Sequence, residues 1–168
     1  MNWYQLDTPI GDLSYALDEA GVCAVHFGPK EGAEPGSGPV ADELNAYFAG
    51  ELTSFSVPLH VRKGTEFERA VWEQMKLIPY GETRSYGYVA GAVGEPAGVV
   101  GWGDGGRGKA AAQAVGIACN RNPLPIIVPC HRIIGADGKL VGFGGGLRLK
   151  RMLLELEAKV KMQLDWAG

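Results

Sequence analysis

The strand-forming and helix-forming patterns of this chain lie in different parts of it. Three short runs rich in aromatic and β-branched residues, 3–8, 13–17 and 22–27, are separated by turn-forming residues such as glycine and aspartate. Such runs, joined by tight turns, predict a three-stranded antiparallel sheet. Apolar residues farther along recur mainly at helical spacing. We therefore expect an α+β fold, with a small N-terminal α/β domain over residues 1–62 and a mostly helical C-terminal domain over residues 63–168.

Helical patterns recur along the rest of the chain, and two of them stand on either side of a glycine-rich stretch. Thr65 is placed to be the N-cap of one helix. Residues 94–108 hold too many glycines for regular structure and predict a long loop. The short helices around this loop resemble a helix-turn-helix, although the connection is far longer than usual. Residues 55–61 could return to the sheet as an edge strand. The expected helices cover residues 41–48, 66–77, 86–93, 109–120 and 147–158.

Charge divides the chain in the same way. The net charge is −3, but residues 1–61 hold one basic and nine acidic side chains, whereas residues 62–168 hold fifteen basic and ten acidic ones. A polyanion would therefore bind the second part of the chain. Solvated surface charge without a partner is the alternative interpretation of this imbalance.

Hydrophobicity and cysteine content indicate the compartment. No apolar run approaches the about 20 residues that a membrane helix needs, and the N-terminus lacks the basic and apolar regions of a signal peptide. Three cysteines without regular spacing argue against a disulfide framework and for a reducing compartment. We expect a cytoplasmic protein without membrane contacts.

A cysteine stands directly before a histidine and an arginine at Cys130-His131-Arg132, after a short apolar run bounded by prolines. A thiol becomes a strong nucleophile as the thiolate, and neighbouring basic or cationic groups favour that form. The three residues therefore indicate a nucleophilic site. A buried structural cysteine beside a chance histidine is the other interpretation that they allow.

The flanking sequence supplies further motifs. They are Ile78-Pro-Tyr-Gly-Glu-Thr-Arg-Ser-Tyr86, Gln113-Ala-Val-Gly116, Asn122-Pro123, Pro129-Cys130-His131-Arg132-Ile133-Ile134, Gly138-Lys-Leu, Gly142-Phe-Gly-Gly-Gly-Leu and Lys150-x-x-Leu-Leu-x-x-Glu157. Together they resemble the O6-alkylguanine-DNA alkyltransferases, most closely the bacterial Ogt-type methylated-DNA–protein-cysteine methyltransferases. The resemblance is strong over residues 65–158, and the N-terminal sheet and the segment Leu44-Asn-Ala-Tyr-Phe-Ala-Gly50 are also similar to the first domain of that family.

The resemblance implies DNA repair by a single-turnover enzyme. Members of the family flip the damaged base out of double-stranded DNA and transfer the alkyl group from guanine O6 irreversibly to their own cysteine. They act as monomers and need no cofactor or metal. Whether O4-alkylthymine is also repaired stays open.

The resemblance also assigns catalytic roles. Cys130 would supply the sulfur, and His131 would be the base that acts through a bridging water. Glu157 would orient the imidazole, as the third member of a hydrolase triad does. Tyr86 would donate a proton to the guanine leaving group and touch backbone phosphate, and Asn122 would brace the turn that carries the cysteine.

Further residues are expected to contact the substrate or the DNA. A small-residue helix face would approach the minor groove, and a loop would cover the flipped base. Arg132 has two interpretations, a contact residue or a structural tie to neighbouring backbone. The remaining contact residues are Gln113, Ala114, Gly116, Phe143, Gly144 and Gly145.

The sequence departs from the family at three places. Gln113 stands where the family usually has the arginine that fills the space of the flipped base. Phe143 stands where the family has a pocket tyrosine. Residues 97–108 lengthen the link between the two short helices, either as a neutral surface insertion or as a segment that alters DNA contacts.

Three alternatives accompany the main interpretation. The chain could be an alkylated-DNA binding protein with weak or no transfer activity, because of Gln113 and the 97–108 insertion. It could be a cysteine hydrolase, which would need an oxyanion hole and turnover. It could contain a zinc module, since Cys23 and His26 have ligand-like spacing, although a structural site needs four ligands.

Overall fold

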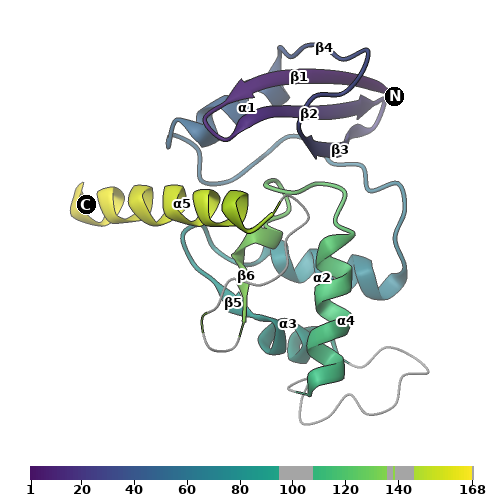
Figure 1. Ribbon diagram of the computed structural model, residues 1–168, viewed down its shortest axis with the longest axis vertical. Helices are drawn as coiled ribbons and strands as arrows, with labels where there is room; N and C mark the ends of the chain where they lie inside the picture. The colour runs from purple at the N-terminus through teal and green to yellow at the C-terminus, as the bar shows by residue number, and fades with distance from the viewer. Residues whose placement is uncertain (95–107, 136–137, 139–145, 168) are drawn as a thin grey trace.

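The computed structural model of the chain describes residues 1–94, 108–135, 138 and 146–167 (Figure 1). A four-stranded sheet forms the N-terminal part, in the order β3-β2-β1-β4. The expected antiparallel strands are β1 (Asn2–Thr8), β2 (Gly11–Asp18) and β3 (Gly21–Phe27). β4 (Glu34–Pro35) is an addition to the predicted sheet and pairs parallel to β1. A charged residue and a proline carry no strand pattern, so only the tertiary pairing identifies β4.

Helix α1 (Pro39–Phe48) packs beside the sheet. Its buried side chains Leu44 and Tyr47 share one core with Leu13 and Tyr15 of β2. α1 begins two residues earlier than the predicted helix, because proline is well tolerated in the first turn of a helix.

The edge strand expected over residues 55–61 is wrong. Among the described residues this segment makes a single isolated bridge to the sheet, between Val22 and Leu59. The Val22 amide donates to the Pro58 carbonyl at 2.9 Å, and the His60 amide donates to the Val22 carbonyl at 2.8 Å. Pro58 has no amide hydrogen, which limits any longer ladder here.

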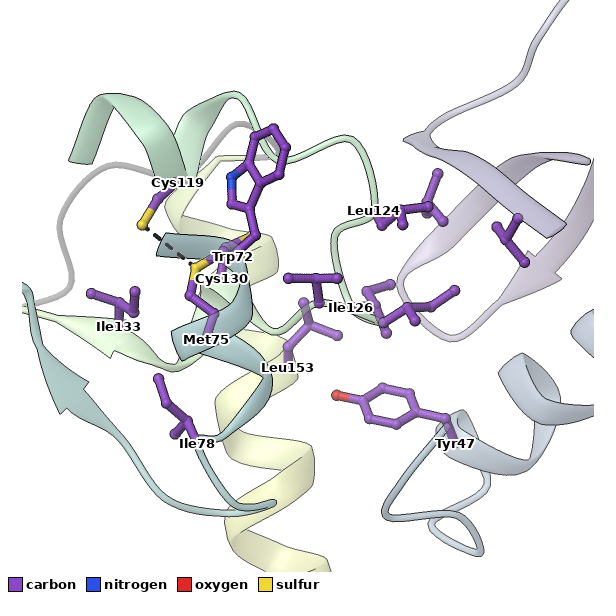
Figure 2. Close-up of a cluster of buried hydrophobic side chains, with 14 of the residues drawn as sticks. Tyr47, Trp72, Met75, Ile78, Cys119, Leu124, Ile126, Cys130, Ile133 and Leu153 are labelled. Atoms are coloured by element: carbon purple, nitrogen blue, oxygen red, sulfur yellow. Dashed lines mark hydrogen bonds between the residues drawn. The ribbon is translucent and has the colours of Figure 1, made fainter. Parts of the chain in front are cut away.

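Three helices build the core of the C-terminal part: α2 (Glu66–Lys76), α3 (Tyr86–Val93) and α4 (Lys109–Asn120). Thr65 caps α2 as predicted: its hydroxyl accepts from the Glu68 amide, and the Glu68 carboxylate accepts from the Thr65 amide. The buried indole of Trp72 donates to the Ala118 carbonyl at 2.8 Å and so ties α2 to α4. Figure 2 shows Trp72 and Met75 among the buried side chains that surround Cys130.

The last helix, α5 (Leu147–Ala167), is longer than predicted. The expected end at residue 158 is wrong because no glycine or proline follows there, and Val160 is still buried. Figure 1 shows α5 between the sheet with α1 and the helices α2, α3 and α4. None of the helices in the described part of the chain is long and apolar enough to cross a membrane.

A two-residue parallel pair joins two distant parts of the C-terminal half. β5 (Arg84–Ser85) pairs with β6 (Ile133–Ile134), in the register Arg84 to Ile133 and Ser85 to Ile134. β5 leads directly into α3, and β6 directly follows a short 3-10 helix, η2 (Cys130–Arg132). The pairing therefore sets the start of α3 beside η2.

Candidate active site

The turn that carries the cysteine is held from within. The Asn122 side-chain amide donates to the Val128 carbonyl at 2.8 Å, and its carbonyl oxygen accepts from the Leu124 amide at 3.0 Å. Between these contacts Ile126 has φ of 75°, which is a strained conformation for a β-branched residue. Such strain persists only where the surroundings fix it. Asn122 is thus placed to brace the turn.

Tyr86 lies at the first position of α3, next to η2 through the β5–β6 pair. The Ser85 hydroxyl accepts from the Tyr88 amide at 3.0 Å and caps this helix. Burial raises the pKa of Tyr86 to about 12, with smaller contributions from the nearby thiols of Cys119 and Cys130. The phenol therefore stays protonated at neutral pH and can donate its proton in a hydrogen bond.

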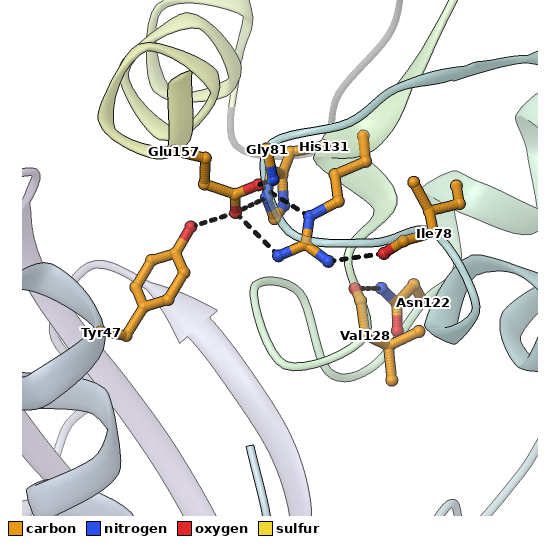
Figure 3. Close-up of polar contacts among 8 residues, drawn as sticks. Tyr47, Ile78, Gly81, Asn122, Val128, His131 and Glu157 are labelled. Carbon is orange, nitrogen blue, oxygen red and sulfur yellow. Dashed lines mark hydrogen bonds and ion pairs between the residues drawn. The ribbon is translucent and has the colours of Figure 1, made fainter. Parts of the chain in front are cut away.

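Helix α5 brings a carboxylate to the residues that follow the cysteine (Figure 3). Glu157 Oε2 lies 2.6 Å from His131 Nε2, and Arg132 contacts both carboxylate oxygens, through Nε at 2.7 Å and Nη2 at 3.0 Å. Burial alone would raise the pKa of Glu157, but the hydrogen bonds and charges of His131 and Arg132 outweigh it and lower the pKa to about 2. Glu157 is therefore ionised at neutral pH.

The imidazole of His131 is fully buried. Burial lowers its pKa, although Glu157 acts in the opposite direction, so the ring is neutral at pH 7. An ionised carboxylate only accepts hydrogen bonds, so Nε2 must carry the ring proton. Nδ1 then has a free lone pair, and among the described residues it has no hydrogen-bond partner. His131 is thus arranged as a neutral base with its accepting atom unoccupied.

The thiol of Cys130 is nearly inaccessible, at 7% exposure. Burial raises its pKa to about 11, while the Asn122 side chain and the charge of Lys150 act in the opposite direction. The resting group is thus the protonated thiol, which needs a base to become nucleophilic. The neutral imidazole of His131 belongs to the next residue in the chain.

The family model described as 6-O-methylguanine DNA methyltransferase, DNA binding domain, matches residues 66–159. The chain belongs to this family. A Mycobacterium tuberculosis protein named methylated-DNA–protein-cysteine methyltransferase is 46% identical over 169 residues, which cover 94% of this chain and 92% of the relative. A Methanosarcina acetivorans protein of the same name is 47% identical over 161 residues, which cover 90% and 94%.

A solved structure agrees over almost the whole length. The crystal structure of Mycobacterium tuberculosis OGT in complex with DNA matches with a TM-score of 0.79 and 43% identity, covering 95% of this chain and 94% of that chain. The resemblance to the methyltransferase family and the α+β fold expected from the sequence are therefore confirmed.

In this methyltransferase, the contacts of Arg132 favour a structural role for this residue. The residue is buried, and its guanidinium donates to Glu157 and, through Nη1 at 2.8 Å, to the Ile78 carbonyl. All three guanidinium nitrogens have partners inside the protein. The structure does not favour its placement among the substrate and DNA contacts, because the side chain is buried and each of its three nitrogens donates to a group of the protein.

The expected contact residues of α4 differ in their exposure. Gln113 is exposed, and Ala114 and Gly116 are half-buried. A Cβ atom at Gly116 would lie 3.9 Å from Tyr86 Cε1, so this part of α4 runs close to Tyr86. Phe143, Gly144 and Gly145, like residues 97–107 of the insertion, lie outside the described residues.

Sequence reasoning assigned no role to three residues near the site. Lys150 is completely buried, with Nζ 5.8 Å from the centroid of the Tyr86 ring, and burial lowers its pKa. Tyr47 and the Gly81 amide both contact Glu157. Lys150 begins the motif that ends at Glu157, so the sequence could have identified it as a residue near the site. Tyr47 lies within the segment over residues 44–50 that resembles the first domain of the family, but only the tertiary structure shows its contact with Glu157.

The zinc alternative gains no support. The Cys23 thiol is buried in the sheet and donates to the Ala16 carbonyl at 3.5 Å, while His26 is exposed. Among the described residues no group of three or more histidine, cysteine or acidic side chains could hold a metal ion.

Proposed function

We propose that this methyltransferase repairs double-stranded DNA by moving the alkyl group of O6-alkylguanine irreversibly onto its own Cys130. The observation that carries this proposal is the contact of the neutral His131 with the ionised Glu157, directly after the buried thiol of Cys130 in the chain. The names of the relatives and the solved complex of a similar protein with DNA support it.

The reaction we propose is a displacement at the alkyl carbon. The thiol proton passes through a bridging water to Nδ1 of His131, the sulfur attacks the alkyl carbon, and the bond from that carbon to O6 breaks. The electron pair of the broken bond stays with the guanine, and the Tyr86 hydroxyl donates a proton to it. The imidazolium proton then restores the tyrosine, so a thiol and an O6-alkylguanine become a thioether and a guanine.

The environment of each group fits its step. His131 must be neutral to accept a proton, and burial keeps it so. Glu157 stays ionised, so it can stabilise the imidazolium that forms. Tyr86 keeps its proton until guanine leaves, because its pKa is raised to about 12. No step regenerates the thiol, and each molecule acts once.

DNA is proposed to bind the C-terminal part. We infer that α3 and α4 form the helix-turn-helix element and that Gln113, Ala114 and Gly116 face the minor groove after base flipping, which costs least for a weakly paired lesion. The exposure of Gln113 and the positive charge of this part support that placement. Phe143, Gly144 and Gly145 would form the loop over the flipped base, as the family resemblance implies.

The wider setting follows from the same resemblance. We propose a cytoplasmic monomer without cofactor, with a domain boundary between residues 62 and 63. The three buried free cysteines suit a reducing compartment, and the family model begins close to that boundary, at residue 66. A role limited to lesion binding is not favoured, because Cys130 is present and the contact between His131 and Glu157 is intact.

Stoichiometry tests the proposal. A duplex with one O6-methylguanine is mixed with increasing amounts of the protein, and the remaining lesion is measured by nucleoside mass spectrometry. We expect one lesion repaired per molecule, with no further repair after longer incubation. Catalytic turnover, or tight binding of the duplex without loss of the lesion, would contradict it. An undamaged duplex of the same sequence is the matched control for binding.

A further inference from the structure

The carboxylate of Glu157 has a partner from the N-terminal part of the chain. The Tyr47 hydroxyl, on α1, donates to Oε2 at 2.6 Å, and the Gly81 amide contacts Oε1 at 3.2 Å. Figure 3 shows Tyr47 reaching Glu157 from one side and His131 from the other. Tyr47 and His131 therefore share one acceptor atom, Oε2, at equal distances of 2.6 Å.

The position of the Tyr47 hydroxyl is fixed by its surroundings. The side chain is 1% exposed, and its ring packs against Phe48, Phe55 and Tyr80, with centroids 5.2, 5.6 and 6.2 Å away. Burial raises the pKa of Tyr47 well above its ordinary value, and the charge of Glu157 adds to the effect. The phenol therefore remains a proton donor at neutral pH.

Two hydrogen-bond donors that share one carboxylate oxygen weaken each other's hydrogen bonds. Each donor draws negative charge from the oxygen, so less charge is left to stabilise the other donor. The carboxylate of Glu157 stabilises the protonated form of His131. A phenol that occupies the same oxygen therefore moderates this stabilisation and acts in the same direction as burial, toward the neutral imidazole.

We propose that Tyr47 is a positioning residue for alkyl transfer: its hydroxyl fixes Oε2 of Glu157 against Nε2 of His131 and so limits the basicity of the imidazole. This inference deepens the proposed function and rests on it. Through this contact the N-terminal part takes part in setting up the reactive site, although it holds none of the reacting atoms.

Other charged and titratable groups also face this cluster. Arg132 of η2 contacts Glu157, Lys150 of α5 acts on His131 through its charge, Tyr80 interacts electrostatically with Glu157, and Cys130 is the chain neighbour of His131. All of these groups are unchanged by Tyr47→Phe. This substitution removes one oxygen atom and keeps the aromatic ring, so it isolates the effect of the hydroxyl.

The test compares Tyr47→Phe with Tyr15→Phe in the full-length chain. Tyr15 is a fully buried tyrosine of β2, so its substitution makes the same chemical change away from Glu157. The midpoint of His131 titration is measured by NMR of histidine-labelled protein, and single-turnover repair of an O6-methylguanine duplex is followed against pH. We expect Tyr47→Phe to raise the His131 midpoint by about one pH unit and to move the acidic limb of the rate profile equally.

A structural role alone would give a different result. Tyr47→Phe would then change the melting temperature only and leave the His131 midpoint at the value found in Tyr15→Phe, which would overturn the proposal. The proposal would also be overturned if His131 showed no titration midpoint in either variant between about pH 5 and 9, a range around the ordinary histidine pKa. If the wild-type chain repairs no lesion, the proposed function fails, whereas the NMR comparison still decides the role of Tyr47.

Discussion

Asn122 and Cys130 share one acceptor, the carbonyl oxygen of Val128, which receives the Asn122 side-chain amide and the Cys130 backbone amide, each at 2.8 Å. The orientation of the thiol thus depends on a side chain at the other end of the turn. Since the backbone at Ile126 is strained, the turn needs such a tie to keep its shape.

Asn122→Ala should therefore cost stability and activity together. It removes two hydrogen bonds and leaves the Leu124 amide without its acceptor, for which we expect a loss of about 1–3 kcal/mol in urea unfolding. Alkyl transfer should slow as well, because the turn relaxes. Asn120→Ala, an exposed position at the end of α4, is the matched control. Equal effects of the two substitutions would show that Asn122 does not brace the turn.

Glu157 predicts a specific dependence of stability on pH. Its pKa is about 2 in the folded chain against an ordinary 4.5, so the folded state binds fewer protons than the unfolded state in this range. The resulting stabilisation, about 3 kcal/mol, is complete above about pH 4.5 and is lost as the pH falls toward 2.

The matched substitutions are Glu157→Gln and Glu155→Gln, buried and exposed positions of the same helix. At pH 7 Glu157→Gln should cost about 3–5 kcal/mol, because the buried Arg132 loses its counter-charge. The difference in the free energy of unfolding between Glu157→Gln and wild type, measured with urea, should become smaller as the pH falls from about 4.5 to 3. A difference that stays constant over this range would contradict the lowered pKa of Glu157 in the folded chain.

Cys130 should behave as a thiol with a raised pKa when no DNA is present. Because burial raises the pKa to about 11, the rate of iodoacetamide labelling should increase about tenfold per pH unit from pH 7 to 10. Restricted access lowers the labelling rate by the same factor at every pH, so the pKa is judged from the slope of the rate against pH. The folded protein is labelled and then digested, and the peptide that contains Cys130 is measured by mass spectrometry, with glutathione as the reference thiol. A plateau of the Cys130 rate near pH 8 would mean that the thiolate is already formed at rest.

Gln113→Arg should increase the rate of repair. Arginine is longer and charged, so it can fill the space of the flipped base and attract the DNA backbone. The control is Gln163→Arg, which adds the same charge at an exposed position of α5. Single-turnover rates are measured for both variants on one duplex. An unchanged rate for Gln113→Arg, or an equal gain for both, would count against a special role for this position.

Local signals in the sequence were sufficient for much of the fold. The predicted bounds of α3 and α4 agree with the structure, since glycine-rich segments end or begin these helices and Ser85 caps α3. The capping box at Thr65 was equally local. The α5 boundary was wrong because good helix formers continue past residue 158 without a stop signal.

Contacts between distant residues were beyond such signals. The catalytic interpretation of Cys130 and His131 came from adjacency, and that of Glu157 came from the family motif. Tyr47 is separated from Glu157 by most of the chain, and no periodicity or spacing relates the two. Likewise β4 exists only through pairing with β1. A structural role for Arg132 was one of two interpretations of the sequence, but its partners, Glu157 and the Ile78 carbonyl, are distant in the chain and only the structure identifies them.

Intact-protein mass spectrometry after mixing with an O6-methylguanine duplex tests the central claim most directly. Wild type and Cys119→Ala, which removes the neighbouring buried thiol, should both gain the mass of one methyl group stoichiometrically, and Cys130→Ala should gain none. Peptide analysis should place the group on Cys130. Unchanged mass in wild type despite binding of the duplex, or a methyl group that persists in Cys130→Ala, would contradict transfer to this cysteine.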